Sequence, residues 1–192
     1  MKYLFSIIAM IYSLGISARD YLPILKEGRV WNCIDSPTLT YPYPEPVQIY
    51  VAEEVVESGH TCRVLRWKNV NGDGIFAIAY EEKGKVYTVN FDGGLYPELL
   101  MLDFNLEKGD VVSDYLCVSN VDYVNINGVV RKRIFFSNES TYWIEGIGPT
   151  YDDVWMSIIA HVIGSFKYLE SCYDDDVCVF KNDEPPFWSD WT

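Results

Sequence analysis

The sequence predicts an all-β protein, an antiparallel meander that forms a sandwich or a partly open barrel with at most one short helix. Short runs rich in Val, Ile, Tyr, Phe and Trp dominate the chain, and these residues favour half-buried strands. Turn residues separate the runs. The clearest are Asn127-Gly128, because both tolerate the positive φ of a tight hairpin. The best helical pattern covers Asp153–Gly164, where a short helix and a strand are equally compatible with the residues.

The expected strands follow one another closely, and polar or Gly-containing turns separate most of them. Short connections of this kind predict antiparallel neighbours. Gln48–Val51 and Lys85–Val89 also show rough apolar and polar alternation, as a strand with one solvated face should. The expected strands are Val30–Ile34, Val47–Val56, Thr61–Trp67, Ile75–Glu82, Lys85–Phe91, Leu99–Phe104, Val111–Val118, Val121–Ile126, Val129–Phe136, Thr141–Ile147, Ser165–Ser171 and Val177–Phe180.

Residues 1–18 have the three parts of a secretory signal peptide. Lys2 supplies the positive start, Tyr3–Gly15 is uncharged and apolar, and Ile16-Ser17-Ala18 leads into the charged chain. The apolar run is shorter than the roughly 20 residues that a membrane-spanning helix needs. We therefore expect cleavage after Ser17 or Ala18, with residues 19–192 forming a single β-rich domain. That domain would have no transmembrane helix and would act in the periplasm, at the cell surface or outside the cell.

The chain is strongly acidic, and this limits its partners. It carries 28 acidic against 15 basic side chains, a formal net charge of −13. A surface of this charge repels phosphate backbones and anionic lipid headgroups. Nucleic acid is therefore not expected as a partner, whereas cations, cationic peptides and neutral glycans are compatible with the charge.

Five cysteines are present, and export permits disulfides. Cys172 and Cys178 flank a short acidic turn that could bring two strands within disulfide range, so a bridge between them and two half-buried thiols are the alternatives. The other three cysteines lie in strand-like runs, where a free thiol packs as a small hydrophobe: Cys33, Cys62 and Cys117. An odd total leaves at least one unpaired unless it pairs with another chain.

No motif predicts a catalytic, cofactor or metal site. Gly72–Ala77 has the spacing of a dinucleotide fingerprint, but the residues after its glycines favour a strand instead of the helix that would hold a pyrophosphate. Asn69–Gly74 resembles half of a calcium loop, yet Tyr80 stands where the bidentate Glu is needed. His60-Thr61-Cys62 has no second pair of ligands for zinc. We therefore expect no cofactor and no metal.

Aromatic residues make up 16% of the chain, and this is the one feature of the composition that points to binding. Exposed aromatic faces suit sugar rings and peptide grooves. Most of these rings are needed for the core of a β domain. The C-terminal tail is especially dense in them, which makes Trp188 and Trp191 candidate ligand contacts, or parts of a lid over a sheet edge.

Five segments match, in the same order, the segments of a known group of proteins. They are Tyr21–Trp31, Gly59–Leu65, Glu81–Tyr87, Leu99–Asp110 and Trp143–Gly148. Together they resemble a group of uncharacterised exported proteins of Bacteroidetes, many of which are lipoproteins or carry a type IX sorting domain. The resemblance implies an extracytoplasmic β-rich fold and no known activity, so it transfers no functional residue. No Cys stands at the expected cleavage point, so a lipid anchor is not expected.

The sequence favours a secreted or periplasmic binding module without enzymatic activity, whose partner would be a glycan, a peptide or a cell-surface protein. The alternatives are a structural or assembly component of the envelope and, less favoured, an uncharacterised hydrolase. A hydrolase would need paired carboxylates or a Cys–His pair, and the sequence marks neither.

Overall fold

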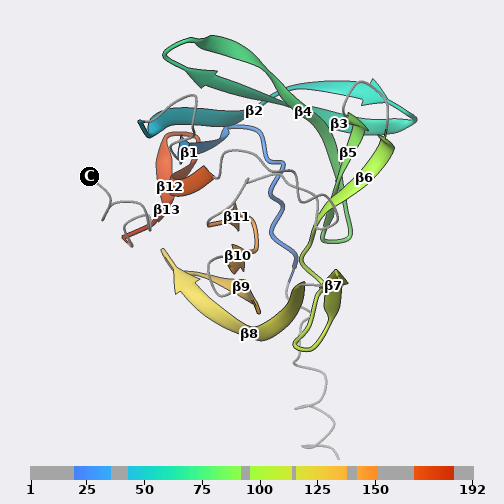
Figure 1. The fold of residues 1–192 in the computed structure, drawn as a ribbon, viewed down its shortest axis with the longest axis vertical. Coiled ribbons are helices and arrows are strands. Elements are labelled where there is room, and N and C mark those ends of the chain that lie inside the picture. The colour runs from blue at the N-terminus through green and yellow to red at the C-terminus, as the bar shows by residue number, and fades with distance from the viewer. Residues whose placement is uncertain are drawn as a thin grey trace, which may run out of the picture.

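The computed structural model describes residues 20–35, 43–91, 96–113, 116–137, 142–150 and 167–183. Within these ranges the chain forms two antiparallel sheets and no helix, and the larger sheet curls into a half-barrel (Figure 1). The expected all-β class is confirmed. Residues 1–18, which are expected to form a signal peptide, and Asp153–Gly164, Trp188 and Trp191 lie outside the described residues.

Eight strands form the larger sheet, in the order β13-β12-β1-β2-β3-β4-β5-β6, and five form the smaller, in the order β11-β10-β9-β8-β7. Most neighbours in a sheet are also neighbours in the chain, as expected for a meander. The bounds are β1 Arg29–Asp35, β2 Glu45–Glu57, β3 His60–Asn69, β4 Gly72–Glu82, β5 Lys85–Phe91, β6 Tyr96–Asp103, β7 Val111–Ser113, β8 Leu116–Ile126, β9 Val129–Phe136, β10 Tyr142–Ile144, β11 Gly148–Pro149, β12 Lys167–Asp174 and β13 Val177–Lys181.

Two-residue turns with positive φ join four of the strand pairs. Asn127-Gly128 has φ values of 53° and 84°, which confirms the predicted tight hairpin between β8 and β9. Ser58-Gly59, Lys83-Gly84 and Asp175-Asp176 are also positive at both positions. This is the backbone of the type I′ turn, whose twist matches that of the strands it connects. Turn chemistry therefore sets the local register of much of the meander.

Two of the expected strands differ in extent from the observed ones. Val111–Val118 is not one strand, because β7 and β8 fold back on each other with Val111 opposite Cys117. Thr141–Ile147 is interrupted after Ile144, where residues 145–147 turn and Gly148 begins β11 opposite Ile144. Both runs are apolar enough for a strand, and neither contains the Asn-Gly pair that marks the hairpin between β8 and β9.

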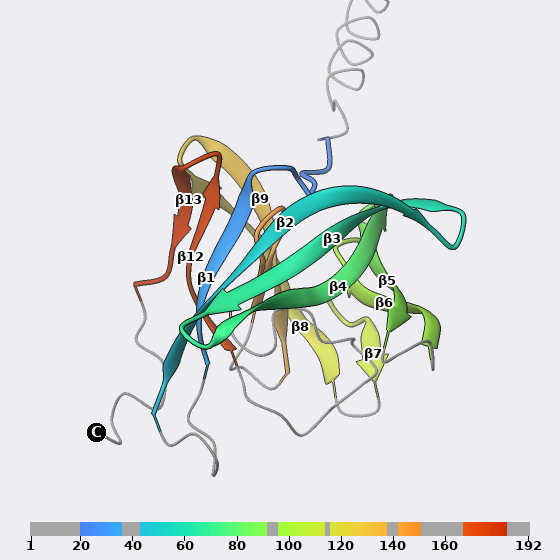
Figure 2. The same cartoon turned by 90° about the horizontal axis from the view of Figure 1, so that it is seen from above.

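The sheets are joined by contacts between parts of the chain that are far apart in sequence. β1 pairs with β12 along its whole length, which brings the last strands of the chain beside the first. Figure 2 shows β13, β12, β1 and β2 side by side at this end of the larger sheet. The amide of Leu169 on β12 donates to the carbonyl of Thr150, directly after β11, at 3.0 Å. The smaller sheet is thereby hydrogen-bonded to the larger one.

The segment 20–28 runs between the two sheets before β1 begins (Figure 1). Glu81 on β4 accepts hydrogen bonds from the Tyr21 hydroxyl and from the amides of Ile24 and Leu25, the latter two at 3.1 Å. Glu145, 4% exposed, accepts from the amides of Leu22 and Lys132, both at 3.1 Å. A carboxylate on β4 and one in the turn between β10 and β11 therefore fix this segment, and both satisfy backbone donors that would otherwise lie without partners in the interior.

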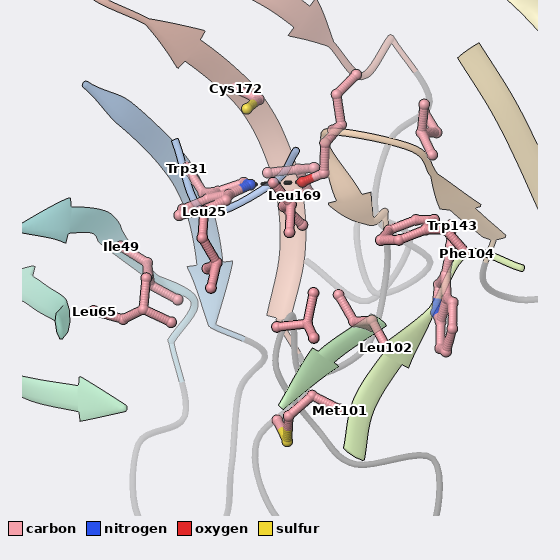
Figure 3. Close-up of a cluster of buried hydrophobic side chains, with 14 of the residues drawn as sticks. Leu25, Trp31, Ile49, Leu65, Met101, Leu102, Phe104, Trp143, Leu169 and Cys172 are labelled. Atoms are coloured by element: carbon pink, nitrogen blue, oxygen red, sulfur yellow. Dashed lines mark hydrogen bonds between the residues drawn. The ribbon is translucent and has the colours of Figure 1, made fainter. Parts of the chain in front are cut away.

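The main core lies between the half-barrel and the smaller sheet. Figure 3 shows its side chains converging from β1, β2, β3, β6, β10 and β12. Trp31 is fully buried, and its indole Nε1 donates to the carbonyl of Ile147 at 2.6 Å. Phe136 and Trp143 meet edge to face with centroids 4.7 Å apart. A fully buried Trp with a satisfied N–H is a favourable core residue because its large apolar area is buried without an unpaired donor.

Among the described residues, no helix is long and apolar enough to cross a membrane.

Candidate functional site

A hollow of about 450 Å³ lies where the edge strand β13 meets the smaller sheet. We call it the seam hollow, because here β13 faces strands of the smaller sheet without pairing with them. Its lining comes from β8 and the turn after it, from β9 and β10, and from β13. The lining residues are Val124, Asn125, Ile126, Asn127, Arg133, Tyr142, Ile144, Cys178, Phe180 and Lys181.

The tight turn between β8 and β9 positions the mouth of the seam hollow. Asn125 Oδ1 accepts a hydrogen bond from the Gly128 amide at 2.8 Å, which stabilises the turn. Asn127, held at positive φ, donates from Nδ2 to the carbonyl of Cys178 on β13 at 3.1 Å. The turn residue therefore ties the tip of this hairpin to the edge of the larger sheet. The predicted turn thus has a second role that its sequence does not reveal.

Arg133 in the lining forms a bidentate ion pair. It lies opposite Asp122 on β8, and its Nε and Nη2 donate to the two carboxylate oxygens at 2.8 and 2.7 Å. Such bidentate pairs fix the guanidinium plane as well as its position. The hydrogen bonds from Arg133 lower the pKa of Asp122, so the carboxylate stays ionised. Arg133 is therefore a preorganised group whose charge is balanced locally.

Aromatic rings surround the same guanidinium. The Arg133 carbon Cζ lies 5.0 Å from the centroid of Phe135 and 5.8 Å from that of Tyr142. The two rings stack with centroids 5.4 Å apart. Cation–π contacts of this length are attractive. Tyr142 therefore presents an oriented ring and hydroxyl at the seam hollow, and apolar side chains, including Ile144 and Phe180, form the deeper wall.

The charge of the lining is opposite to that of the whole protein. Arg133 and Lys181 are cationic, and the described lining contains no Asp, Glu or His. Within the described part of the chain, Lys181 makes no ion pair, and its side chain is exposed. The described lining thus offers hydrogen bonds, an aromatic ring and positive charge, but neither a carboxylate nor an imidazole, the side chains most often used as general bases.

A bridge between Cys172 and Cys178 is one of the two alternatives that the sequence leaves open, and in the structure both thiols are free. The hairpin register gives the physical reason. Cys172 lies opposite Phe180, whereas Cys178 lies opposite Tyr173, with a bulge between the two pairs. Cys172 is fully buried in the core, where burial raises the pKa of its thiol to about 12, whereas Cys178 is half-buried and lines the seam hollow. The two cysteines therefore occupy different environments.

The His60-Thr61-Cys62 segment lies away from the seam hollow, at the start of β3 in the larger sheet. The His60 ring stacks on Tyr80 with centroids 3.9 Å apart and planes within 6°, and Tyr80 stacks on Tyr87 at 5.0 Å. Cys62 is fully buried, and burial raises the pKa of its thiol. The described residues contain no group of three or more His, Cys, Asp or Glu placed to hold a metal ion. The rings thus pack into a small second apolar cluster.

The segment that resembles half of a calcium loop, and the acidic turn between Cys172 and Cys178, both have structural partners. Asn69 accepts a hydrogen bond from the Asn71 amide at 2.8 Å within the β3–β4 turn. Asp174, at the end of β12, pairs with Arg29 at 2.5 Å and with Lys26 at 3.4 Å. Burial tends to raise the pKa of Asp174, but the hydrogen bond from Arg29 prevails and the net shift is downward. This carboxylate therefore anchors the start of β1.

Sequence reasoning missed the residues that form the seam hollow. Arg133, Tyr142 and Lys181 are unremarkable in the sequence, whereas Asn127 is notable only as a turn residue and Cys178 only as a candidate for a disulfide. The missing information is the long-range placement of β13 beside the β8–β9 hairpin. The other candidate contacts, Trp188 and Trp191, lie outside the described residues.

Comparisons of the chain with protein-family models, with curated proteins and with solved structures find no match.

Proposed function

We propose that the protein is an exported binding module without enzymatic activity, and that its ligand, a glycan or a peptide, occupies the seam hollow. Residues 1–18 would serve as its signal peptide, which places its action in the periplasm, at the cell surface or outside the cell. The single observation that supports this site most strongly is the combination of a hollow of about 450 Å³ with an ordered Arg133–Tyr142 wall. Small-molecule sites have volumes of about 300–1,000 Å³ and a few oriented polar groups within an apolar lining.

The composition of the lining favours binding over hydrolysis. Glycoside hydrolysis commonly uses two carboxylates that flank the bond to be cleaved. Among the described lining residues the strongest nucleophile is the thiol of Cys178, and none of the others is a His or a carboxylate of the kind that commonly activates such a thiol. Amides, a phenol and two cations are instead suited to hold a polar ligand in place.

Filling the seam hollow should weaken binding. We expect Val124→Trp to weaken the binding of any glycan or peptide found by array screening by about tenfold or more, or about 1.4 kcal/mol. Val124 is half-buried and lines the hollow, so the larger ring would occupy the ligand's space. The measurement is isothermal titration calorimetry of the purified protein with the array hit.

The matched control is Val70→Trp, which adds the same ring at an 80% exposed position in the turn between β3 and β4. This variant should bind like the wild type. Circular dichroism checks that both variants keep the strand spectrum. A folded Val124→Trp variant with unchanged affinity would remove the seam hollow from consideration, and arrays without any signal above background would count against the binding function itself.

A further inference from the structure

We propose that the ligand of the seam hollow is an acidic sugar, a glycan whose bound unit carries a carboxylate that pairs with Lys181. This inference rests on the proposed binding function and specifies the ligand class for the same site. The overall charge of the protein favours neutral or cationic ligands, so the inference departs from what the composition alone indicates.

The charge of the seam hollow differs from that of the whole chain. The chain has almost twice as many acidic as basic side chains, 28 against 15, yet the described lining of the seam hollow holds two cations and no acid. Electrostatic complementarity selects partners and orients them more than it adds affinity. A cationic hollow within an acidic protein therefore discriminates in favour of an anionic group that fits this position.

The two cations of the lining, Arg133 and Lys181, differ in their ion pairing. Arg133 is neutralised by its bidentate pair with Asp122, so it serves mainly to orient the wall. Lys181 carries the charge that is not balanced by an ion pair within the described residues, and it lies on β13, across the hollow from β8 and β9. An ammonium group is a compact point charge on a flexible stem, which suits a single carboxylate. Lys181 is therefore assigned to the acid group of the ligand.

The β13 edge and the lining of the hollow favour a sugar over an extended peptide. A peptide strand would most readily add to the free edge of β13, where it needs the edge carbonyls as acceptors. Asn127 Nδ2 already donates to one of them, that of Cys178. The β8–β9 turn thus covers part of this edge, and a loop over an edge protects it from further strand pairing. The lining instead offers the mixed polar and aromatic surface that a sugar ring requires. This surface comes from the amides of Asn125 and Asn127 and from the ring and hydroxyl of Tyr142.

The test uses two sugars that share the same rings and differ at their carboxyl groups, namely trigalacturonate and its fully methyl-esterified, uncharged form. Calorimetry should show that the wild type binds the acid about fivefold more tightly than the ester, the size expected for one partly exposed charge-assisted contact. Lys181→Ala should remove this preference, whereas Lys181→Arg should retain it. Lys68→Ala, which removes an exposed lysine on β3, is the matched control and should behave like the wild type. Raising the salt concentration should weaken binding of the acid alone.

The possible results separate this inference from the proposed function. Equal affinity for acid and ester, or an unchanged preference in Lys181→Ala, would overturn the acidic ligand and leave a binding module for neutral glycans. Binding of an acidic peptide without binding of either sugar would also overturn it. If no glycan and no peptide binds, the proposed function fails as well.

Discussion

Replacing Trp31 with alanine is expected to lower the free energy of unfolding by about 4 kcal/mol, the range found for buried Trp or Phe changed to Ala. Trp31 is 0% exposed and lies at the centre of the core, facing side chains from both sheets (Figure 3). Its removal would leave a large cavity and would deprive the Ile147 carbonyl of its donor. Urea unfolding followed by circular dichroism measures the change.

Trp31→Phe separates the two contributions because it keeps most of the ring but loses the indole N–H. We expect it to cost about 2 kcal/mol, less than the alanine variant, since part of the cavity is filled. Tyr43→Ala, at a ring that is 78% exposed, should change stability by less than about 0.5 kcal/mol. A Trp31→Ala variant with nearly wild-type stability would mean that the two sheets do not pack around this ring.

Replacing Glu81 with alanine is expected to cost about 3 kcal/mol, because a buried donor left without its charged acceptor costs about 1–3 kcal/mol. The carboxylate accepts from the Tyr21 hydroxyl and from the amides of Ile24 and Leu25. Its loss would free the segment 20–28 from β4, while the bond from the Leu22 amide to Glu145 would remain. Amide hydrogen exchange should therefore accelerate at Ile24 and Leu25 more than in the sheets.

The neighbouring residue provides the control for this change. Glu82 is exposed, and its carboxylate pairs with Lys83 at 3.0 Å at the surface. Exposed pairs contribute little, so Glu82→Ala should cost less than about 1 kcal/mol. Tyr21→Phe should lose less than Glu81→Ala, because it removes one of the bonds to the carboxylate and leaves the backbone amides paired. Equal effects of Glu81→Ala and Glu82→Ala would contradict the proposed anchoring of this segment.

Local sequence signals predicted the strands and the hairpins because the information that sets them is local. Residues such as Asn127-Gly128 determine a turn through their own backbone preferences, and the observed φ values agree. β5 and β9 match their expected bounds, Lys85–Phe91 and Val129–Phe136, residue for residue. Where a turn lacks such residues, as in Val111–Val118, the same apolar pattern concealed a fold-back.

Long-range features were beyond sequence reasoning. The pairing of β1 with β12 joins residues more than 130 positions apart, from Arg29 opposite Asp174 to Asp35 opposite Lys167. Nothing distinguishes Glu81 and Glu145 among the 28 acids until the segment 20–28 is seen between the sheets. The seam hollow depends on the same kind of information, because its walls come from strands that are distant in the chain. In a single sequence, the residues that make such contacts are far apart and carry no local pattern that marks them.

Cys178 provides a direct reporter for the seam hollow because its thiol lines the cavity and is half-buried. Cys117 on β8 is also half-buried but is not part of the described lining, so it serves as an internal control. Cys172 should react slowly in the folded protein, since it is fully buried and burial raises its pKa to about 12.

Occupation of the seam hollow is tested most directly by the rate at which iodoacetamide alkylates Cys178, followed by peptide mass spectrometry with and without trigalacturonate. Saturating sugar should slow the alkylation of Cys178 several-fold and leave that of Cys117 unchanged. Trigalacturonate that binds, as shown by calorimetry, without protecting Cys178, or that slows both cysteines equally, would show that the ligand lies elsewhere on the protein.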